Sequence, residues 1–158
     1  MKQKNFFLLI VSLAVSLSAG FFGSFFTITG PGTWYDLLTK PSFNPPNWIF
    51  APVWTLLFIF MGIALFLVWR RAETKVQILH IWKYFSLQLI FNILWSFCFF
   101  YLQNPRLAFL EIIALIIFII AMMIYFYKID KRSLYLLLPY LMWVSFATLL
   151  TYSIWQLN

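Results

Sequence analysis

Five long apolar runs, each nearly free of charged residues, divide this chain. They cover residues 6–28, 47–69, 80–102, 106–127 and 133–155. Each run contains 22 or 23 residues, and about 20 residues are enough for an α-helix to cross roughly 30 Å of hydrocarbon. The pattern therefore predicts an all-α integral membrane protein, a bundle of five transmembrane helices. Little sequence remains between the runs, so residues 1–158 are interpreted as a single transmembrane domain.

The composition agrees with this interpretation. The chain is 64% hydrophobic and 9% charged, whereas about a quarter of the residues in a soluble domain are charged. One alternative concerns the first run, because Lys2 and Lys4, followed by apolar and small residues, resemble a cleavable signal peptide. The apolar character continues to Ile28, beyond the roughly 7–15 residues of a signal-peptide core, which favours a membrane-spanning helix.

Lysine and arginine are distributed unevenly between the two ends of such a bundle. Only Lys40 and Arg106 lie on the side away from the N-terminus. The side of the N-terminus holds nine cations: Lys2, Lys4, Arg70, Arg71, Lys75, Lys83, Lys128, Lys131 and Arg132. Cytoplasmic segments are enriched in cations, so the N-terminus is predicted to be cytoplasmic and the C-terminus outside.

The same asymmetry bounds the localisation and the partners. Short termini without a targeting extension favour a bacterial cell membrane, with the outer mitochondrial membrane as the alternative. The net charge of +7 is explained by topology and by contact with the lipid bilayer. No nucleic acid partner is expected, because no basic domain exists to bind one.

The connection over residues 29–46 is the longest in the chain, at 18 residues. Loops of this length are usually disordered or functional. Disordered segments are poor in aromatic residues and rich in charge, but this one carries three aromatic residues and only two charged ones. It also holds four of the seven prolines, which reduce the entropy lost on ordering. It is therefore predicted to be a lid, formed by Trp34, Lys40, Pro41 and Pro46 together with Tyr35.

Polar and aromatic residues follow one stripe of the third run. Gln88, Asn92, Trp95, Ser96 and Phe99 recur at intervals of three and four residues, which places them on one face of a helix. Polar groups at membrane depth avoid lipid, so this face is predicted to point into the bundle or into a cavity.

Two tryptophans lie deep within their runs rather than at the membrane surface, where tryptophans concentrate. Trp143 is 12 residues from the end of its run, about 18 Å at the rise of an α-helix. Trp54 lies about 10 Å below the start of the second run. Their indole N–H groups need internal acceptors, which favours a polar aromatic pocket over lipid exposure. Ordinary packing of aromatic side chains is the alternative.

Small residues recur at every fourth position of the first run, at Ser12, Ser16, Gly20 and Ser24. Such a stripe permits helices to approach closely. It is interpreted as internal packing, with a dimer interface as the alternative.

Glu111 is the one carboxylate inside a run. Intramembrane acids often serve functions such as proton coupling, but Arg106 lies only five residues earlier, which favours pairing with a nearby cation. Cys98 and His80 are the only cysteine and histidine. No disulfide within the chain and no metal site are therefore expected.

A longer pattern covers nearly the whole chain. It comprises Trp34-Tyr35, Leu38, Lys40-Pro41-Ser42-Phe43, Pro45-Pro46, Trp48, Phe50, Pro52-Val53-Trp54-Thr55 and Met61-Gly62, followed by Asn92, Trp95-Ser96, Phe99-Phe100, Pro139-Tyr140, Trp143 and Phe146-Ala147. This pattern resembles the translocator protein family, also called the tryptophan-rich sensory protein or peripheral-type benzodiazepine receptor family.

The resemblance implies a five-helix bundle, often a homodimer, whose first loop covers a pocket for hydrophobic ligands. It implies porphyrins such as protoporphyrin IX and haem as ligands, with sterols and synthetic benzodiazepine-site ligands as further partners and no required cofactor. Carried over by position, the ligand-binding residues are Tyr35, Pro45, Trp54, Gln88, Asn92, Trp95, Trp143 and Ala147.

One departure from the family concerns sterols. The family's sterol motif ends in a cation after its tyrosine. Here Tyr152 is followed by Trp155 and Gln156 at the corresponding place, which argues against sterol binding.

Three functions are compatible with these observations. The first is a membrane receptor that binds porphyrins and transports or senses them. The second is a porphyrin-degrading enzyme that depends on light and oxygen. The chain offers no acid–base dyad or activated nucleophile, so the catalytic residues of such an enzyme would be Trp54 and Trp143. The third is a proton-coupled small-molecule exporter that uses Glu111.

Overall fold

The computed structural model describes residues 2–158, and all the regular secondary structure in this range is helical. The five long helices are α1 (Lys2–Ser24), α3 (Asn47–Trp69), α4 (Lys75–Ser96), α5 (Pro105–Ile129) and α6 (Arg132–Leu157). The single turn α2 (Trp34–Leu37) lies in the long connection, and a π-helical turn, η1 (Phe97–Tyr101), continues α4. All five long helices are long and apolar enough to cross a membrane. The predicted five-helix membrane bundle is confirmed.

Side chains next to the helices fix several of their ends. Thr74 and Gln77 form a capping box at the start of α4, in which Thr74 Oγ1 accepts from the Gln77 N–H at 3.1 Å. Asn104 Oδ1 accepts from the Leu107 N–H at 3.0 Å, next to Pro105, which has no N–H to satisfy. A cap of this kind contributes about 1 kcal/mol.

Helices α1 and α4 differ from the predicted runs by four residues or more, whereas the bounds of α3, α5 and α6 lie within two residues of them. Helix α1 ends at Ser24 rather than residue 28. The predicted end was too late because hydropathy indicates which residues suit an apolar surrounding, and not whether they are helical. Phe25 and Ile28 remain largely exposed at 62% and 61%, although the chain has already turned there. Helix α4 begins at Lys75 rather than residue 80, since its capped first turn is polar and invisible to hydropathy.

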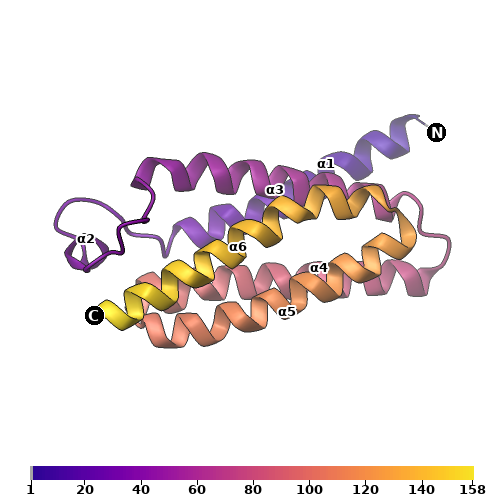
Figure 1. The fold of residues 1–158 in the computed structure, drawn as a ribbon. Coiled ribbons are helices and arrows are strands. Elements are labelled where there is room, and N and C mark those ends of the chain that lie inside the picture. Colours follow the sequence, from indigo (N-terminus) through magenta and orange to yellow (C-terminus); the bar gives the residue numbers. More distant parts are fainter. Residues whose placement is uncertain (1) are drawn as a thin grey trace.

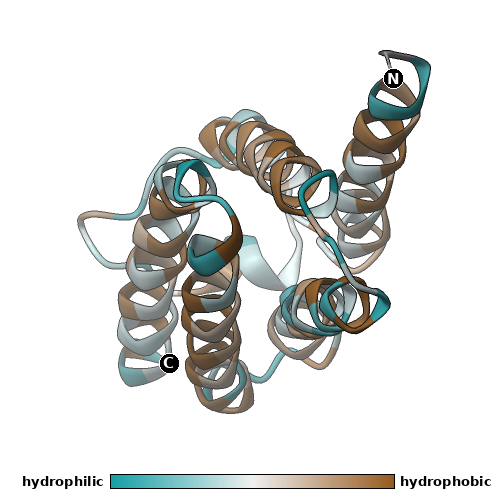
Figure 2. Cartoon of the chain, turned by 90° about the vertical axis from the view of Figure 1, so that its right-hand side faces the viewer, coloured by the Kyte–Doolittle hydropathy of each residue, from teal (hydrophilic) through white to brown (hydrophobic). Residues whose placement is uncertain are grey.

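The long helices form a closed ring. Helix α1 packs against α3, α3 against α6, α6 against α5, α5 against α4, and α4 against α1. Figure 2 views this ring from the end that carries the N-terminus, and the polar residues gather towards the loops. The two termini lie at opposite ends of the bundle, with α2 at the end of the C-terminus (Figure 1).

Small residues allow α1 to approach α3 closely. An added Cβ on Gly62 would come within 3.0 Å of the Leu13 Cα, and one on Gly20 within 2.7 Å of the Phe58 ring. Ser16 Oγ also donates to the Phe58 carbonyl at 2.7 Å. This part of the small-residue stripe therefore serves internal packing.

One carboxylate joins two loops at the end of the bundle opposite α2. Asp130 lies between α5 and α6, and its side chain is only 2% exposed. It pairs with Arg132 Nη2 at 3.0 Å and with Arg71 Nε, from the α3–α4 connection, at 3.3 Å. These bonds, chiefly those to the Arg132 guanidinium, hold the pKa of Asp130 below its usual value.

Candidate ligand pocket

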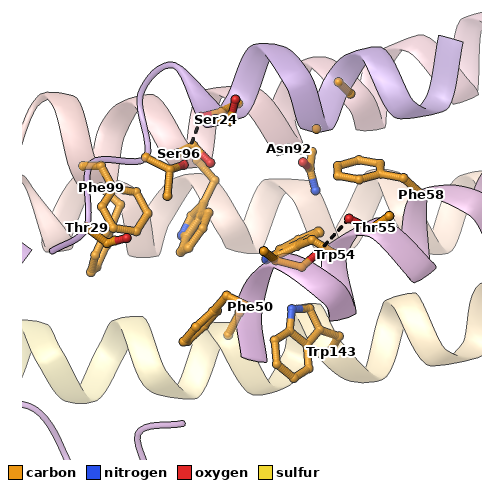
Figure 3. A pocket seen from close by; sticks show the side chains of 18 of the residues that line it. Ser24, Thr29, Phe50, Trp54, Thr55, Phe58, Asn92, Ser96, Phe99 and Trp143 are labelled. Atoms are coloured by element: carbon orange, nitrogen blue, oxygen red, sulfur yellow. Dashed lines mark hydrogen bonds between the residues drawn. The ribbon is translucent and has the colours of Figure 1, made fainter. Parts of the chain in front are cut away.

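A cavity of about 450 Å³ lies inside the ring, in the half of the bundle nearest α2. Helices α1, α3, α4 and α6, the turn η1 and the segment around α2 all contribute to its wall. Figure 3 shows side chains from these elements converging on it. Its volume lies within the range of roughly 300–1,000 Å³ that is usual for small-molecule sites.

Three tryptophans from three helices form the aromatic part of the wall. Trp54 of α3 stacks on Phe58 with ring centroids 5.7 Å apart, and Trp95 of α4 stacks on Phe99 at 5.5 Å. In both pairs the partner is four residues further along the chain, within α3 for Trp54 and in the turn η1 for Trp95, and side chains at this spacing meet on a helix. Trp143 of α6 packs on Phe50 of α3 with ring centroids 5.9 Å apart (Figure 3). The cavity is thus walled by flat rings held in fixed orientations.

Two indole N–H groups at this cavity are buried without a hydrogen-bond partner. They belong to Trp95 and Trp143, both of which line the cavity. An unsatisfied buried donor costs about 1–3 kcal/mol. The nitrogen atoms themselves are buried, so an acceptor atom of a ligand would reach either donor only after a shift of the indole ring.

A buried polar network lies below the tryptophans. Asn92 Nδ2 donates to Tyr140 Oη at 3.1 Å, and Tyr140 Oη donates to Gln88 Oε1 at 2.9 Å. Asn92 lines the cavity, whereas Tyr140 and Gln88 are fully buried behind it. The network therefore fixes the position of the Asn92 amide in the cavity wall.

The structure brings together six of the eight residues predicted to bind ligand: Tyr35, Trp54, Asn92, Trp95, Trp143 and Ala147. Gln88 does not line the cavity, because the Tyr140 hydroxyl holds it one layer further in. Pro45 does not line it either. It lies in the loop before α3, where its carbonyl accepts from Asn44 Nδ2 at 3.0 Å.

Helix α1 also contributes to the cavity wall, which was not predicted from the sequence. Residues of its second half line the cavity, among them Ala19, Gly20, Gly23 and Ser24. Their small side chains predicted close packing, and the same absence of bulk leaves room for a cavity between α1 and α4. An added Cβ on Gly23 would lie 3.7 Å from Ser96 Oγ, an ordinary contact.

The segment around α2 packs onto the bundle instead of extending into solvent. Tyr35 is only 4% exposed, lies 5.5 Å from the Phe100 ring and donates to Asn44 Oδ1 at 3.3 Å. Burial raises the pKa of the Tyr35 hydroxyl, although the bond to Asn44 lowers it in part. Trp34 packs on Phe99 at 5.7 Å.

The four lid residues other than Tyr35 do not line the cavity. Lys40 Nζ lies 4.7 Å from the centre of the Tyr35 ring, and the Pro41 carbonyl accepts from the Asn44 N–H at 3.0 Å. Pro46 immediately precedes α3. These residues support the segment from outside, and its opening and closing as a lid stays a prediction.

The predicted pairing of Glu111 with a cation is wrong. Both carboxylate oxygens are buried and have no hydrogen-bond partner, and among the side chains that the structure describes the ion pairs are those of Asp130. The Arg106 guanidinium instead lies 5.9 Å from the centre of the Trp155 ring. Arg106 therefore lies against Trp155 and not against Glu111.

A ring of five membrane-spanning helices around a tryptophan-lined cavity defines an integral membrane protein with an internal aromatic pocket. Residues 11–156 match the sequence model of the TspO/MBR family. The chain is 44% identical over 157 residues to the tryptophan-rich protein TspO of Archaeoglobus fulgidus, covering 98% of this chain and 99% of the relative. It is 34% identical over 150 residues to the human translocator protein, covering 93% and 87%. The chain belongs to the TspO/MBR family.

Proposed function

We propose that this protein is a membrane receptor for porphyrins such as protoporphyrin IX and haem, and that it transports or senses them. The observation that carries the proposal is the convergence of three indoles on one cavity, two of them with an unpartnered N–H. Flat rings stack well against a macrocycle, and the indole donors suit its oxygen acceptors. A relative in Cereibacter sphaeroides is named tryptophan-rich sensory protein, which supports a sensory role.

The proposal extends to further ligands and to the assembly. Synthetic benzodiazepine-site ligands are proposed as a second ligand class, since they are flat and apolar. Sterols are a weaker proposal, because no cation follows Tyr152. No cofactor is required in this account, and a homodimer is proposed as the assembly.

Haem is expected to bind no better than the metal-free macrocycle. Axial ligation of its iron uses a His, Cys, Met or Tyr side chain. Among the described residues that line the cavity, Tyr35 is the one side chain of these types, and its hydroxyl is engaged with Asn44.

Titration of the purified protein with protoporphyrin IX, followed by quenching of tryptophan fluorescence, tests the proposal. Trp48 provides a matched control, because it is 74% exposed and does not line the cavity. Trp54→Phe is expected to weaken binding, and Trp48→Phe to leave it unchanged. Equal affinities for both variants and the parent protein would contradict binding in this cavity.

A second candidate is light-dependent oxidative degradation of the porphyrin. It is favoured by one observation, the presence of Trp54 and Trp143 in the wall of the same cavity, where either indole could donate an electron to an excited porphyrin. Illumination of the complex with oxygen present, followed by absorption spectroscopy, tests it. Loss of porphyrin at the same rate without protein would rule it out.

A third candidate is proton-coupled export. It is favoured by the buried carboxylate of Glu111, which has no partner within the described residues, since an isolated intramembrane acid often carries protons. Efflux from vesicles across a pH gradient tests it. Flux that is unchanged in Glu111→Gln would remove this candidate.

A further inference from the structure

The cavity reaches the outer surface of the bundle between α1 and α3. Leu17 and Phe21 of α1 line it although they are 38% and 62% exposed. Ala51 and Thr55 of α3 also line it and are exposed. These four side chains border both the cavity and the outside where α1 and α3 meet, and they are called the lateral portal below.

This portal lies at membrane depth. Thr55 is eight residues inside α3, which begins at Asn47, or about 12 Å along the helix. Leu17 is seven residues before the end of α1, or about 10 Å. Helices α1 and α3 pack closely next to the portal, where Gly20 meets the Phe58 ring. Figure 1 shows α1 and α3 separating towards the α2 end. The portal therefore faces lipid hydrocarbon rather than water.

The hydroxyl groups around the portal are adapted to an apolar surrounding. Thr55 Oγ1 donates to the Ala51 carbonyl at 2.8 Å, and Ser24 Oγ donates to the Phe21 carbonyl at 2.7 Å (Figure 3 shows the first bond). Each hydroxyl thus satisfies its donor within its own helix, as polar groups exposed to hydrocarbon require. Neither needs water, and neither presents its donor to a passing ligand.

The end of the cavity that faces water is only partly covered, since Thr27, Thr29 and Asn47 there line the cavity and are exposed. Tyr35 of α2 lies over it with 4% exposure. The loop after α2 is joined to the end of α6, because Thr39 N–H donates to Asn158 Oδ1 at 2.9 Å and Asn158 Nδ2 donates to the Thr39 carbonyl at 3.0 Å. A ligand that displaced the α2 segment would have to break these contacts.

We propose that hydrophobic ligands reach the cavity from the lipid bilayer, through the portal between α1 and α3, and that the α2 segment stays closed during uptake. The ligand class rests on the proposed function, namely a flat macrocycle that partitions into the leaflet nearest α2. The bilayer concentrates such a ligand at the portal, and its apolar body never has to cross water.

The kinetic test uses the protein in lipid vesicles and follows protoporphyrin IX by its absorption. Thr55→Trp narrows the portal, and Leu56→Trp is the matched control, because Leu56 is the next residue, 49% exposed, and does not line the cavity. Thr55→Trp is expected to slow association and dissociation together by about tenfold while Kd changes less than about threefold. If Thr55→Trp does not fold, Ala51→Trp replaces it.

Locking the α2 segment provides the opposite variant. Thr39→Cys and Asn158→Cys, combined with Cys98→Ala and bridged by a short bifunctional reagent, hold the loop against α6. Uptake in the bridged protein is expected to stay within about twofold of the unbridged one. Uptake that is blocked by the bridge, or that is insensitive to a bulky residue at the portal, would overturn the proposal.

A second readout does not depend on porphyrin binding. In a Cys98→Ala background, Ala147→Cys places a thiol in the cavity wall, where Ala147 is 6% exposed. N-phenylmaleimide dissolved in the vesicles is expected to label this thiol, and Thr55→Trp to suppress the labelling. Labelling by an external sulfonated maleimide at the same rate would overturn the portal. Failure of protoporphyrin to bind the parent protein would refute the proposed function and leave this readout to decide the portal.

Discussion

At the scale of single residues, the indole ring sets the chemistry of the cavity. Trp54, Trp95 and Trp143 each combine a large apolar ring with one N–H donor. The donors of Trp95 and Trp143 are unpartnered, so these side chains are packed as rings but incomplete as hydrogen-bonding groups. A phenyl ring at the same place would fill the space and lose the donor, which separates packing from recognition.

Replacement of Trp54 or Trp143 by Phe is therefore expected to preserve the fold and weaken the ligand complex. Thermal stability should change little, because an aromatic ring still fills most of the volume. Porphyrin affinity should fall by roughly 1–2 kcal/mol, or about five- to thirtyfold. Any light-dependent breakdown should fall further, since phenyl does not replace indole as an electron donor. The melting temperature, the Kd and the product yield of each variant are the measurements. A loss of stability with unchanged Kd would show that both residues only pack in the core and do not bind the ligand.

Asp130 supplies a residue-scale prediction on stability. Its folded pKa lies below the value of about 3.9 expected in an unfolded chain. Its contribution is therefore complete above that value and is lost as the pH falls through the folded pKa. Asp130→Asn should lower stability by about 1–3 kcal/mol at neutral pH, and the difference from the parent should shrink in acid. Thermal unfolding at both pH values measures this, with exposed Glu73→Gln as the control that should show no such effect.

Two pairs of residues show why a site cannot be predicted fully from spacing in the sequence. Gln88 and Asn92 share a stripe of α4, but only Asn92 lines the cavity, because the Tyr140 hydroxyl from another helix lies over Gln88. Glu111 and Arg106 are five residues apart and do not pair, since Trp155 of α6 receives the guanidinium. In both cases a side chain distant in sequence decides the outcome.

At the scale of elements, the packing of α1 on α3 shapes both the core and the cavity. Gly62 and Gly20 permit contact in the middle of the two helices, and from this contact the helices diverge towards the α2 end (Figure 1). Apolar run length predicted these helices well. It did not predict where α1 ends, because the residues of the turn that follows are also apolar. It did not predict the π-helical turn η1 either, because a change in the backbone hydrogen-bonding pattern does not alter hydropathy.

A pair of glycine substitutions tests this packing. Gly62→Ala should destabilise the protein by about 1–3 kcal/mol, because the added methyl meets the Leu13 backbone and helices must move apart. Gly23→Ala should be neutral or stabilising by up to about 1 kcal/mol, since its Cβ finds ordinary space and alanine favours helix. Melting temperatures in one detergent compare the two, and equal shifts would contradict the packing argument.

The α2 segment yields a second prediction at this scale. Replacement of Pro45 and Pro46 by Gly should loosen the chain before α3 and weaken the hold of Tyr35 on the cavity. Each change adds conformational freedom worth about 0.4–1 kcal/mol, so porphyrin should dissociate about two- to tenfold faster, with a smaller change in association. Pro31→Gly, on the other side of α2, is the control. Unchanged dissociation in the double variant would mean that the segment is only a connector.

At the scale of the whole molecule, the ring of helices combines two different surfaces. Its sides are apolar and its ends carry nearly all the charge. The inside is neither purely apolar nor charged, because the cavity wall and the buried Gln88–Tyr140–Asn92 network hold uncharged polar atoms at membrane depth. The apolar runs that form the sides of the ring predicted a five-helix membrane bundle, and the deeply placed tryptophans predicted part of the cavity wall. The sequence could not predict which helices are neighbours, and the portal depends on that arrangement.

The orientation proposed for this ring in the membrane, with the N-terminus in the cytoplasm, rests on its charge. Nine of the eleven lysines and arginines belong to the end with the N-terminus and two to the end with α2, and cations are retained on the cytoplasmic side. In a Cys98→Ala background, a cysteine at Ser42 should therefore react with an impermeant maleimide in intact bacteria, whereas a cysteine at Glu73 should react only after lysis. Both positions are exposed, so labelling depends on the side of the membrane on which the cysteine lies and not on whether it is buried in the protein. The reverse pattern would place α2 in the cytoplasm, and the portal would then open to the inner leaflet.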